Sequence, residues 1–408
     1  MTPSLSPRLV LTALFPFALG YLLSYLLRAV NAVVAPDLVA DAGLSAGELG
    51  LLTAAYLGAF AFFQLPLGVL LDRYGPRRVQ AGLLTIACIG CIGFALAPDF
   101  AGLFAARAVI GLGFSAGLMA GYKASSLWVP LERRSLVNAS IMATGAVGIV
   151  FATEPTEFLV SLIGWRQAFM VFAGLTLACA LFIFLAVPKR EGESTPVPLS
   201  TQLRQLLRIL ALPLFWRIVP LLALTAGVQI ALHGLWAGPW FRDVMGLSRP
   251  EVARHLLWMA VAFMIGILFA GIIADRAGRR GISPISVMIG CHMVYFIAQA
   301  IIVLEFIPLA VVAWLATAAT GQVAILAYPW LAQHVGNELA GRSNAAINFS
   351  VFLVAFATQY GVGVIIGLFP ATTIGYEPSS YRWAFGIFLV LQLAALAWYL
   401  IGRRKEHA

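Results

Sequence analysis

The stretch GVLLDRYGPRR at residues 68–78 ends a long apolar run with a compact set of charges. A close copy, GIIADRAGRR at residues 271–280, ends another apolar run about half the chain length further on. Each copy has a glycine, an Asp-Arg pair, a second glycine and two arginines in the same order. A charged phrase that recurs at half the length of a chain predicts a duplicated structural unit.

The composition predicts that the apolar runs cross a membrane. Of the 408 residues, 61% are hydrophobic and only 11% are charged, whereas about a quarter of the residues in soluble domains are charged. A helix needs about 20 apolar residues to span a bilayer, and these runs are too long and do not alternate as barrel strands do. We expect an all-α membrane protein with twelve transmembrane helices, at residues 11–36, 46–71, 79–97, 101–127, 135–162, 166–187, 213–241, 251–275, 284–303, 307–334, 343–368 and 381–402.

The first run is longer than the apolar part of a signal peptide. It ends in APDLVADAG, at residues 35–43, which predicts the end of a helix followed by a loop.

The basic residues predict the orientation of the chain. The formal net charge is +9, and most Lys and Arg residues between the spans fall on the same side as both termini. The opposite side holds Arg166, Arg242, Arg249, Arg254 and Arg382. Because cytoplasmic loops are enriched in Lys and Arg, we expect both termini in the cytoplasm and the protein in the inner (plasma) membrane. Contact with membrane lipid accounts for the charge, so we expect no nucleic-acid partner.

The segment PKREGESTPVPLSTQLRQLLRILALP, residues 188–213, separates six spans from six. Its first half is polar and rich in proline, as linkers are. Its second half is amphipathic, with Leu199, Leu203, Leu206, Leu207 and Leu210 on one face, which predicts a short helix on the inner membrane surface. We expect an N-terminal six-helix bundle at 1–187, a cytoplasmic linker at 188–212 and a C-terminal six-helix bundle at 213–408. Smaller echoes support the duplication: GWRQAF (164–169) and YRWAFG (381–386) each enter the last span of a half.

A twelve-span chain with G-x-x-x-D-R-x-G-x-R-R after its second span, repeated after its eighth, resembles the major facilitator superfamily. The resemblance extends over the whole chain, and two copies of the motif at matching positions make it specific. It implies a secondary transporter rather than an enzyme, with two six-helix bundles related by pseudo-twofold symmetry. The bundles rock about a central cavity that opens to one side of the membrane at a time. We expect no cofactor, no metal and a monomer.

The doubled motif predicts a gate rather than a substrate site. Each copy lies where a span meets a cytoplasmic loop, and an aspartate there stabilises the positive N-terminus of a nearby helix. We expect Asp72 to face the eleventh span and Asp275 to face the fifth when the inner gate is closed. The gating residues are then Asp72, Arg73, Arg77, Asp275, Arg276 and Arg279. A plain topology anchor is the alternative, and the two roles are compatible.

Arg28 lies deep in the first span, where an ionisable side chain is costly and is therefore a functional candidate. Helical spacing places Tyr21, Ser24, Tyr25 and Asn31 on its face, and none of them is negative. A guanidinium can hold a carboxylate or a phosphate through two parallel hydrogen bonds. We expect Arg28, with Tyr21, Tyr25 and Asn31, to bind an anionic substrate. A structural ion pair is the alternative.

His233 lies in the seventh span, which is the counterpart of the first. The region around Arg28 is similar to the organophosphate:phosphate antiporter branch, which carries a second arginine on the seventh span. Because this chain has His233 there instead, the site favours a carboxylate or is sensitive to pH. Helix packing is the alternative. The other substrate contacts expected in the second half are Gln229, Trp236, Tyr328 and Gln359, with Gln322 and Asn348 as further polar candidates. Such uncharged groups often only join helices.

Four further ionisable residues lie within predicted spans. Lys123, near the inner end of the fourth span, is expected either to contact the substrate or to extend to the membrane interface. Arg107 is a candidate for coupling or gating because RAVIGLG resembles an arginine motif of proton-coupled members; a structural pair is the alternative. Glu154 and Glu157, which flank Pro155, either carry a coupled proton, pair with Arg28 or Arg107, or lie at the outer mouth.

Three function classes follow from these candidates. Uptake or exchange of a small organic anion is favoured, because Arg28, Lys123 and His233 are basic and efflux of cations requires acidic dominance. Proton-driven efflux of amphiphilic compounds is the alternative, although the Gly-Pro motif of drug:proton antiporters does not follow Gly145 or Gly148. A membrane sensor that transports nothing is disfavoured by the two intact motifs.

Overall fold

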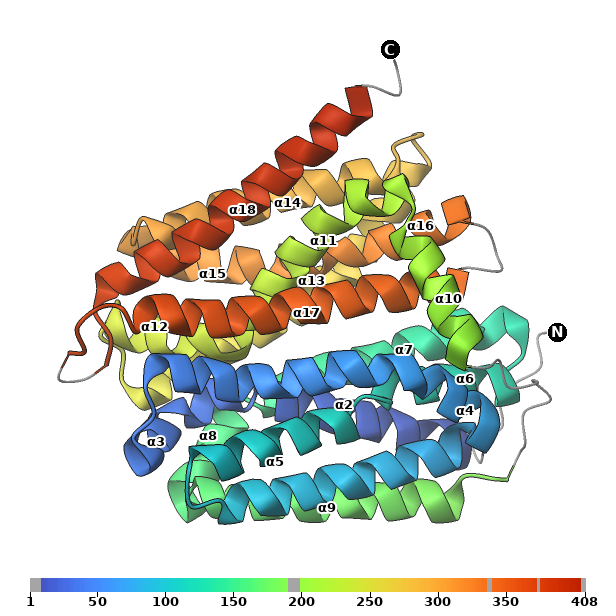
Figure 1. Cartoon of the computed structure of the whole chain (residues 1–408), viewed down its shortest axis with the longest axis horizontal. Coiled ribbons are helices and arrows are strands. Elements are labelled where there is room, and N and C mark those ends of the chain that lie inside the picture. The colour runs from blue at the N-terminus through green and yellow to red at the C-terminus, as the bar shows by residue number, and fades with distance from the viewer. Residues whose placement is uncertain (1–8, 190–198, 336–339, 373–374, 405–408) are drawn as a thin grey trace. The chain divides into compact units, whose positions relative to one another are not determined.

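The computed structural model describes residues 9–189, 199–335, 340–372 and 375–404 (Figure 1). These residues are almost entirely helical; no strand occurs among them, and one isolated bridge joins Ala371 to Tyr376. Twelve helical segments are long and apolar enough to cross a membrane. The expected fold class, an all-α membrane protein with twelve spans, is therefore confirmed.

The first six spans are built from nine helical elements. They are η1 (Val10–Leu14), α2 (Phe15–Ala29), α3 (Asn31–Ala42), α4 (Ala46–Leu96), α5 (Phe100–Gly113), α6 (Gly117–Trp128), α7 (Leu131–Phe151), α8 (Glu154–Ile163) and α9 (Trp165–Ala186). The second half follows the linker helix. Its elements are α10 (Leu199–Leu210), α11 (Pro213–Ala231), η2 (Leu232–Trp236), α12 (Ala237–Asp243), α13 (Arg249–Gly278), α14 (Pro284–Val303), α15 (Ile307–Gly321), η3 (Gln322–Leu326), α16 (Ala327–Val335), α17 (Ala340–Ile366) and α18 (Pro378–Arg404).

The contacts within the chain divide it into two compact units. Unit 1 comprises residues 1–37 and 55–201, and unit 2 comprises residues 38–54 and 202–408. Residues 38–54 belong to unit 2 because glycines let the start of α4 approach α17. A Cβ at Gly363 would overlap the Ala46 carbonyl oxygen, and a Cβ at Gly50 would lie 2.8 Å from the Gln359 carbonyl oxygen. The division of the chain at 187 and 213 into two bundles stays a prediction.

The two copies of the charged motif turn the chain at different glycines. Gly75 has φ 75° and ψ 161°, and this left-handed residue breaks α4 into the second and third spans. Its sequence counterpart, Gly278, is the last residue of α13, and the positive φ of 75° occurs instead at Gly281. Only glycine adopts such a conformation without strain. Both copies of the motif therefore lead into a turn at a glycine with positive φ, but the two glycines are not at equivalent positions of the repeat.

The first and fourth spans of each half are interrupted helices. The first span is divided at Val30, between α2 and α3, and the fourth breaks at 114–116. Their counterparts contain the π-helical turn η2 and the 3₁₀ turn η3. Discontinuous helices are where transporters place substrate and ion sites, because the freed backbone groups can face a cavity. The shared interruptions support the internal duplication.

Two expectations at helix ends were wrong. The segment 35–43 does not form a loop, because α3 stays helical to Ala42 with Pro36 inside it. A proline removes one hydrogen bond and bends a helix but need not end it. The fifth span is not continuous over 135–162 either. It breaks at 152–153, since Pro155 at the start of α8 cannot donate to the preceding turn.

The predicted linker helix is present as α10, but it also packs on protein. Leu206 and Ile209 are buried, and the Arg342 Nε–H donates to the Gln205 side-chain oxygen at 3.1 Å. Leu207, expected on the apolar face, is 57% exposed. The buried side is therefore turned slightly from the predicted leucine stripe. Residues 190–198 of the linker lie outside the described residues.

An arginine at the start of the last span secures the third span in each half. The Arg166 Nη1–H donates to the carbonyl oxygens of Ala95 and Ala97, both at 2.9 Å. In the second half, the Arg382 Nη2–H donates to Glu305, two residues past the end of α14, at 3.0 Å. A cation stabilises the negative C-terminus of a helix. The sequence echo GWRQAF and YRWAFG thus marks a shared packing device.

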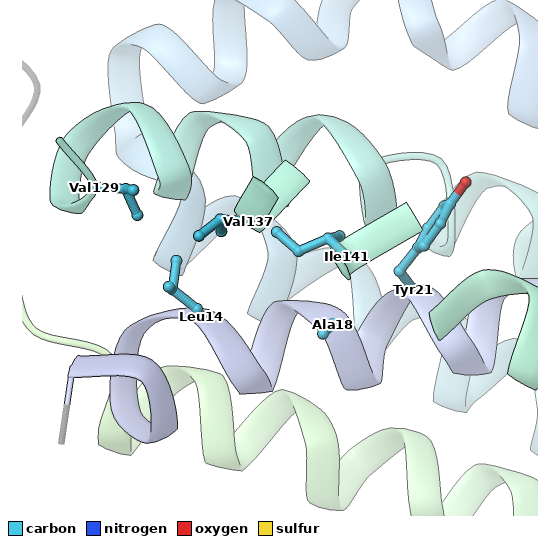
Figure 2. Packing of buried hydrophobic residues seen from close by; sticks show 6 residues of the cluster. All are labelled: Leu14, Ala18, Tyr21, Val129, Val137 and Ile141. Carbon is cyan, nitrogen blue, oxygen red and sulfur yellow. The ribbon is translucent and has the colours of Figure 1, made fainter. Parts of the chain in front are cut away.

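Close packing of α2 against α7 forms the base of the unit 1 site. Figure 2 shows Leu14, Ala18 and Tyr21 from the first span facing Val137 and Ile141 of α7. The helices approach closely because α7 presents glycines. A Cβ at Gly148 would overlap the Leu22 carbonyl oxygen, and a Cβ at Gly145 would lie 2.7 Å from the Tyr21 ring and 2.9 Å from the Tyr25 ring. These two glycines therefore position the tyrosines of the first span.

Replacing Gly148 with alanine should separate α2 from α7. The new methyl group overlaps a backbone atom that cannot rotate away, and overpacking of this kind costs about 1–3 kcal/mol. We expect a lower Tm of the detergent-solubilised protein, measured by thermal unfolding. Gly174→Ala in α9 is the matched control, because no atom lies within 4 Å of a Cβ there. Equal Tm values for the two variants would refute the close approach.

Candidate functional site

Arg28 lies in an aromatic enclosure in unit 1. Its guanidinium carbon is 4.5 Å from the centre of the Tyr25 ring, 4.9 Å from Phe60 and 5.9 Å from Tyr56. The π face of an aromatic ring is negative and attracts a cation without pairing its charge. The side chain is half-buried at the end of α2, next to the break between α2 and α3 at Val30. Arg28 thus lies among aromatic rings beside an interruption of the first span.

Tyr56 is the ring that links two arginines. Its hydroxyl donates to the Ser24 carbonyl oxygen at 3.1 Å, which fixes the ring against α2. Arg107, from α5, lies 5.1 Å from the centre of the same ring, and its Nη2–H donates to the Arg28 carbonyl oxygen at 3.4 Å. Gly111, one turn further along α5, makes this possible, because a Cβ there would overlap the Tyr56 backbone.

Arg107 is completely buried. In the part of the chain that the structure describes, its Nε and Nη1 have no hydrogen-bond partner, and no acidic side chain pairs with it. The structural ion pair considered for Arg107 is therefore not formed with a described residue. A buried guanidinium without an acid is costly, so Arg107 is a candidate for a functional role in unit 1.

The predicted polar stripe on the first span divides into two groups. Tyr25 and Arg28 are half-buried. Tyr21, Ser24 and Asn31 are 6%, 1% and 0% exposed, so other helices cover them. Tyr21 stacks edge-on with Tyr25 at 5.0 Å between ring centres. In this structure Tyr21 and Ser24 support the enclosure from behind, and substrate contact by Tyr21 and Asn31 stays a prediction.

The polar residues of unit 2 form a neutral group. His233, in η2, is half-buried, and its Nε2 lies 3.2 Å from the Thr317 hydroxyl oxygen. Gln229, one turn earlier, is buried and bonds to the backbone of Thr317 and Ala318 and to the Gln322 side chain. No charged side chain takes part in these hydrogen bonds. Sequence reasoning named His233, Gln229 and Gln322 but not Thr317, which looks like any helix threonine in the sequence.

The remaining candidates of unit 2 join helices. The Trp236 indole N–H donates to the Gln359 carbonyl oxygen at 3.2 Å, and both residues are fully buried. The Tyr328 hydroxyl donates to the Asn348 side-chain oxygen at 2.7 Å, which ties α16 to α17. These contacts match the packing alternative stated for uncharged groups. Substrate contact by Trp236, Gln359 or Tyr328 stays a prediction.

A buried carboxylate that the sequence did not single out anchors the end of α12. Asp243 accepts hydrogen bonds from the Tyr381 hydroxyl at 2.6 Å and from the Tyr376 backbone N–H at 3.0 Å. Its other oxygen pairs with Arg242 at 2.5 Å. Burial raises the pKa of the Tyr376 phenol to about 12. The cluster fixes the loop before α18 against the span that carries His233.

Glu154 and Glu157 lie in the first turn of α8, just after the break in the fifth span. Glu157 is buried, and Glu154 is half-buried. The N-terminus of a helix stabilises a carboxylate, so the break gives these acids a defined environment. The continuous apolar span Leu131–Phe151 ends before both of them. Their role in coupling stays a prediction.

The first motif copy makes its described contacts inside unit 1. The Lys123 ammonium lies 2.7 Å from an Asp72 carboxylate oxygen, with both side chains about a quarter exposed. Arg77 donates to the Phe184 carbonyl oxygen from Nε at 2.8 Å, near the end of α9. Lys123 therefore pairs with Asp72, a partner that neither of its two sequence interpretations included; its substrate contact stays a prediction.

The second motif copy is more exposed. Asp275 pairs with Arg279, four residues later, at 2.9 Å, with side chains 63% and 77% exposed. In the first copy, by comparison, Arg73 lies 5.2 Å from the centre of the ring of its chain neighbour Tyr74. Asp275 thus has a local partner where Asp72 has one from another helix. The gating roles of these residues and of Arg276 stay predictions.

Comparison with known proteins agrees with this architecture. The model of the Major Facilitator Superfamily matches residues 17–359. The hexuronate transporter of Escherichia coli (strain K12) is 30% identical over 179 residues, which are 43% of this chain and 41% of that protein. The galacturonate transporter of Dickeya chrysanthemi is 30% identical over 189 residues, 46% of this chain and 53% of that protein. The matches thus span about half the length of these relatives, or less.

A solved structure shares the fold over nearly the full chain. It is a bacterial homologue of the human lysosomal transporter Spinster, with a TM-score of 0.77, 18% identity and 98% coverage of both chains.

Variants of Asp72 and Lys123 test whether transport depends on the ion pair itself or on the negative charge of Asp72. Asp72→Asn should slow transport strongly, because the aspartate is expected to act on a helix N-terminus as well as on Lys123. Lys123→Gln should slow it mildly, since a pair this exposed contributes about 0–1 kcal/mol. The exchange Asp72→Lys with Lys123→Asp restores the pair but places a cation where the negative charge is needed.

We therefore expect the exchanged variant to stay inactive in proteoliposome uptake, while its Tm stays near that of the wild type. Arg382→Gln, which removes an ion pair outside both copies of the motif, serves as the control. Recovery of full transport in the exchanged variant would mean that the pair alone matters.

Proposed function

Because the chain belongs to the Major Facilitator Superfamily of membrane transporters, we propose that it is a secondary active transporter for a small organic anion, working by alternating access. The observation that carries the proposal is the Arg28 enclosure, in which Tyr25, Tyr56 and Phe60 hold a guanidinium next to the interruption of the first span. The π faces of aromatic rings attract a cation and help to orient it. A carboxylate is the planar partner that a guanidinium binds best.

A second positive charge strengthens the case for an anion. Arg107 and Arg28 lie near the same Tyr56 ring, at 5.1 Å and 5.9 Å from its centre. Two guanidinium groups near one ring make the surroundings of Tyr56 positive, and in a medium of low dielectric constant a positive environment favours an anion. The efflux alternative requires acidic dominance at the site, whereas Arg28 lies among the rings of Tyr25, Tyr56 and Phe60 and Arg107 lies near the same Tyr56 ring.

The names of the relatives fit this substrate class. Hexuronate and galacturonate are carboxylates, and both relatives match this chain at 30% identity. Since the matches span about half of those proteins or less, their substrates come to this chain as part of the proposal. The proposal includes an inner-membrane location with both termini cytoplasmic, a monomeric transporter and protons as the coupling ion.

Arg28→Lys tests the anchor while the charge is retained. An ammonium cannot make two parallel hydrogen bonds to a carboxylate. Loss of a charged hydrogen bond costs about 1.5–3 kcal/mol, which is roughly a tenfold to hundredfold loss of affinity. We expect this weakening for galacturonate in direct binding measurements on purified protein, with Arg28→Ala weaker still. Arg382→Lys, at an exposed pair remote in the chain, is the control. Unchanged affinity in Arg28→Lys would remove Arg28 from the site.

Glu157→Gln tests proton coupling. A neutral amide keeps the shape of the side chain but cannot carry a proton. We expect accumulation driven by a pH gradient to be lost, while exchange of substrate for substrate in proteoliposomes persists, because that cycle needs no net proton movement. Glu154→Gln, the half-buried neighbour, is measured alongside. Loss of both activities together would indicate a structural role for the carboxylate instead.

A further inference from the structure

Two irregular turns of unit 2 hold a set of neutral polar side chains. The π-helical turn η2 carries His233, and the 3₁₀ turn η3 carries Gln322. Gln229 and Thr317 complete the set from the ends of α11 and α15. Irregular turns of this kind are frequent at functional sites, because they displace side chains from the regular helical pattern. The direction of each hydrogen bond in the set decides which kind of ligand it can take.

The first chain of hydrogen bonds runs from Trp314 to His233. The Trp314 carbonyl oxygen can only accept, so the Thr317 hydroxyl donates to it, at 2.8 Å. The hydroxyl has one proton, and its oxygen is left as an acceptor. His233 Nε2, at 3.2 Å, must therefore be the donor. In the neutral imidazole the proton is then on Nε2, and Nδ1 is a hydrogen-bond acceptor.

The second chain of hydrogen bonds ends in the same way. The carbonyl oxygens of Thr317 and Ala318 accept from the Gln229 amide nitrogen at 3.4 and 3.3 Å, which sets the orientation of that amide. Its oxygen then accepts from the Gln322 amide nitrogen at 3.0 Å. The Gln322 side-chain oxygen is left as an acceptor. Both chains of bonds thus begin at backbone carbonyls and end at an acceptor atom.

Both terminal acceptors are accessible. His233 and Gln322 are half-buried, and neither His233 Nδ1 nor the Gln322 side-chain oxygen makes a hydrogen bond in the described part of the chain or is among its buried unsatisfied atoms. Gly234, next to His233, has no atom within 4 Å of where a Cβ would stand. This surface of unit 2 therefore has room for a ligand beside it.

We propose that His233 Nδ1 and the Gln322 side-chain oxygen bind hydroxyl groups of the substrate, so that the transported anion is a polyhydroxylated carboxylate. An acceptor pairs with a donor, and a hydroxyl donates whereas a carboxylate does not. His233 thus recognises the neutral part of the substrate and does not replace a second arginine as an anion ligand. The inference rests on the proposed function, because it specifies the class of organic anion.

Two isosteric variants separate the acceptor from the packing contact. His233→Gln places an amide near Nε2, where it can still donate to Thr317, but it offers no acceptor at the Nδ1 position. His233→Asn places an amide oxygen near the Nδ1 position and gives up the bond to Thr317. Thr317→Val removes the acceptor that sets the imidazole tautomer, so the ring can carry its proton on Nδ1 instead. Each variant is first checked by Tm for correct folding.

The probes are galacturonate, hexanoate and galactose, measured by direct binding to the full-length purified protein. Galacturonate has hydroxyls and a carboxylate, hexanoate only the carboxylate and galactose only the hydroxyls. We expect the wild type to prefer galacturonate. His233→Gln and Thr317→Val should each weaken galacturonate binding about three- to tenfold, the value of a neutral hydrogen bond, and leave hexanoate unchanged. His233→Asn should keep most of the galacturonate affinity.

The outcomes distinguish this inference from the proposed function. Equal loss for galacturonate and hexanoate in His233→Gln, or no loss for either, overturns the role of His233 as a hydroxyl ligand while the anion site at Arg28 stands. Binding of galactose as tight as that of galacturonate, still dependent on His233, overturns the anion proposal and keeps the hydroxyl site. A wild type that binds none of the three probes overturns both.

Discussion

The buried positive charge beside Tyr56 constrains the rest of unit 1. Two guanidinium groups in an apolar region are costly, and the fold accommodates them by close approach of three helices. Gly111 lets α5 reach the Tyr56 backbone, and Gly145 and Gly148 let α7 hold the tyrosines of α2. The rings of Tyr25 and Phe60 then contact the Arg28 guanidinium and help to position it.

The two halves share their helical architecture but differ in the charge of side chains at matching places. Interruptions recur in the first and fourth spans of both halves, and an arginine secures the third span in each. The side chains at matching places differ in charge, however, since the first span carries Arg28 and the seventh carries His233 within a neutral group. Duplication thus supplies two similar frameworks whose side chains at matching places can be chemically different.

The doubled charged motif shows the same divergence. Asp72 meets Lys123 from another helix, whereas Asp275 meets Arg279 within its own turn of helix. The turn glycine is Gly75 in one copy and Gly281 in the other. The aspartates of the two motif copies therefore have different partners. Asp72 is held by a residue from another helix, whereas Asp275 is held by a residue of its own helical turn. An ion pair between helices couples their movement, and a pair within one helix does not.

The sequence by itself determined the class of fold, the number of spans, the duplication and the depth of Arg28, because hydropathy and the cost of charge in lipid depend on local composition. It also pointed to His233, Gln229 and the motif residues. Tertiary structure decided which side chains meet. Tyr56, Phe60 and Thr317 have no signal of their own in sequence and become part of a site only through helices that glycines bring close. The pairing of Lys123 with Asp72 likewise depends on a neighbour far along the chain. The continuation of α3 through Pro36 was also not evident from the sequence.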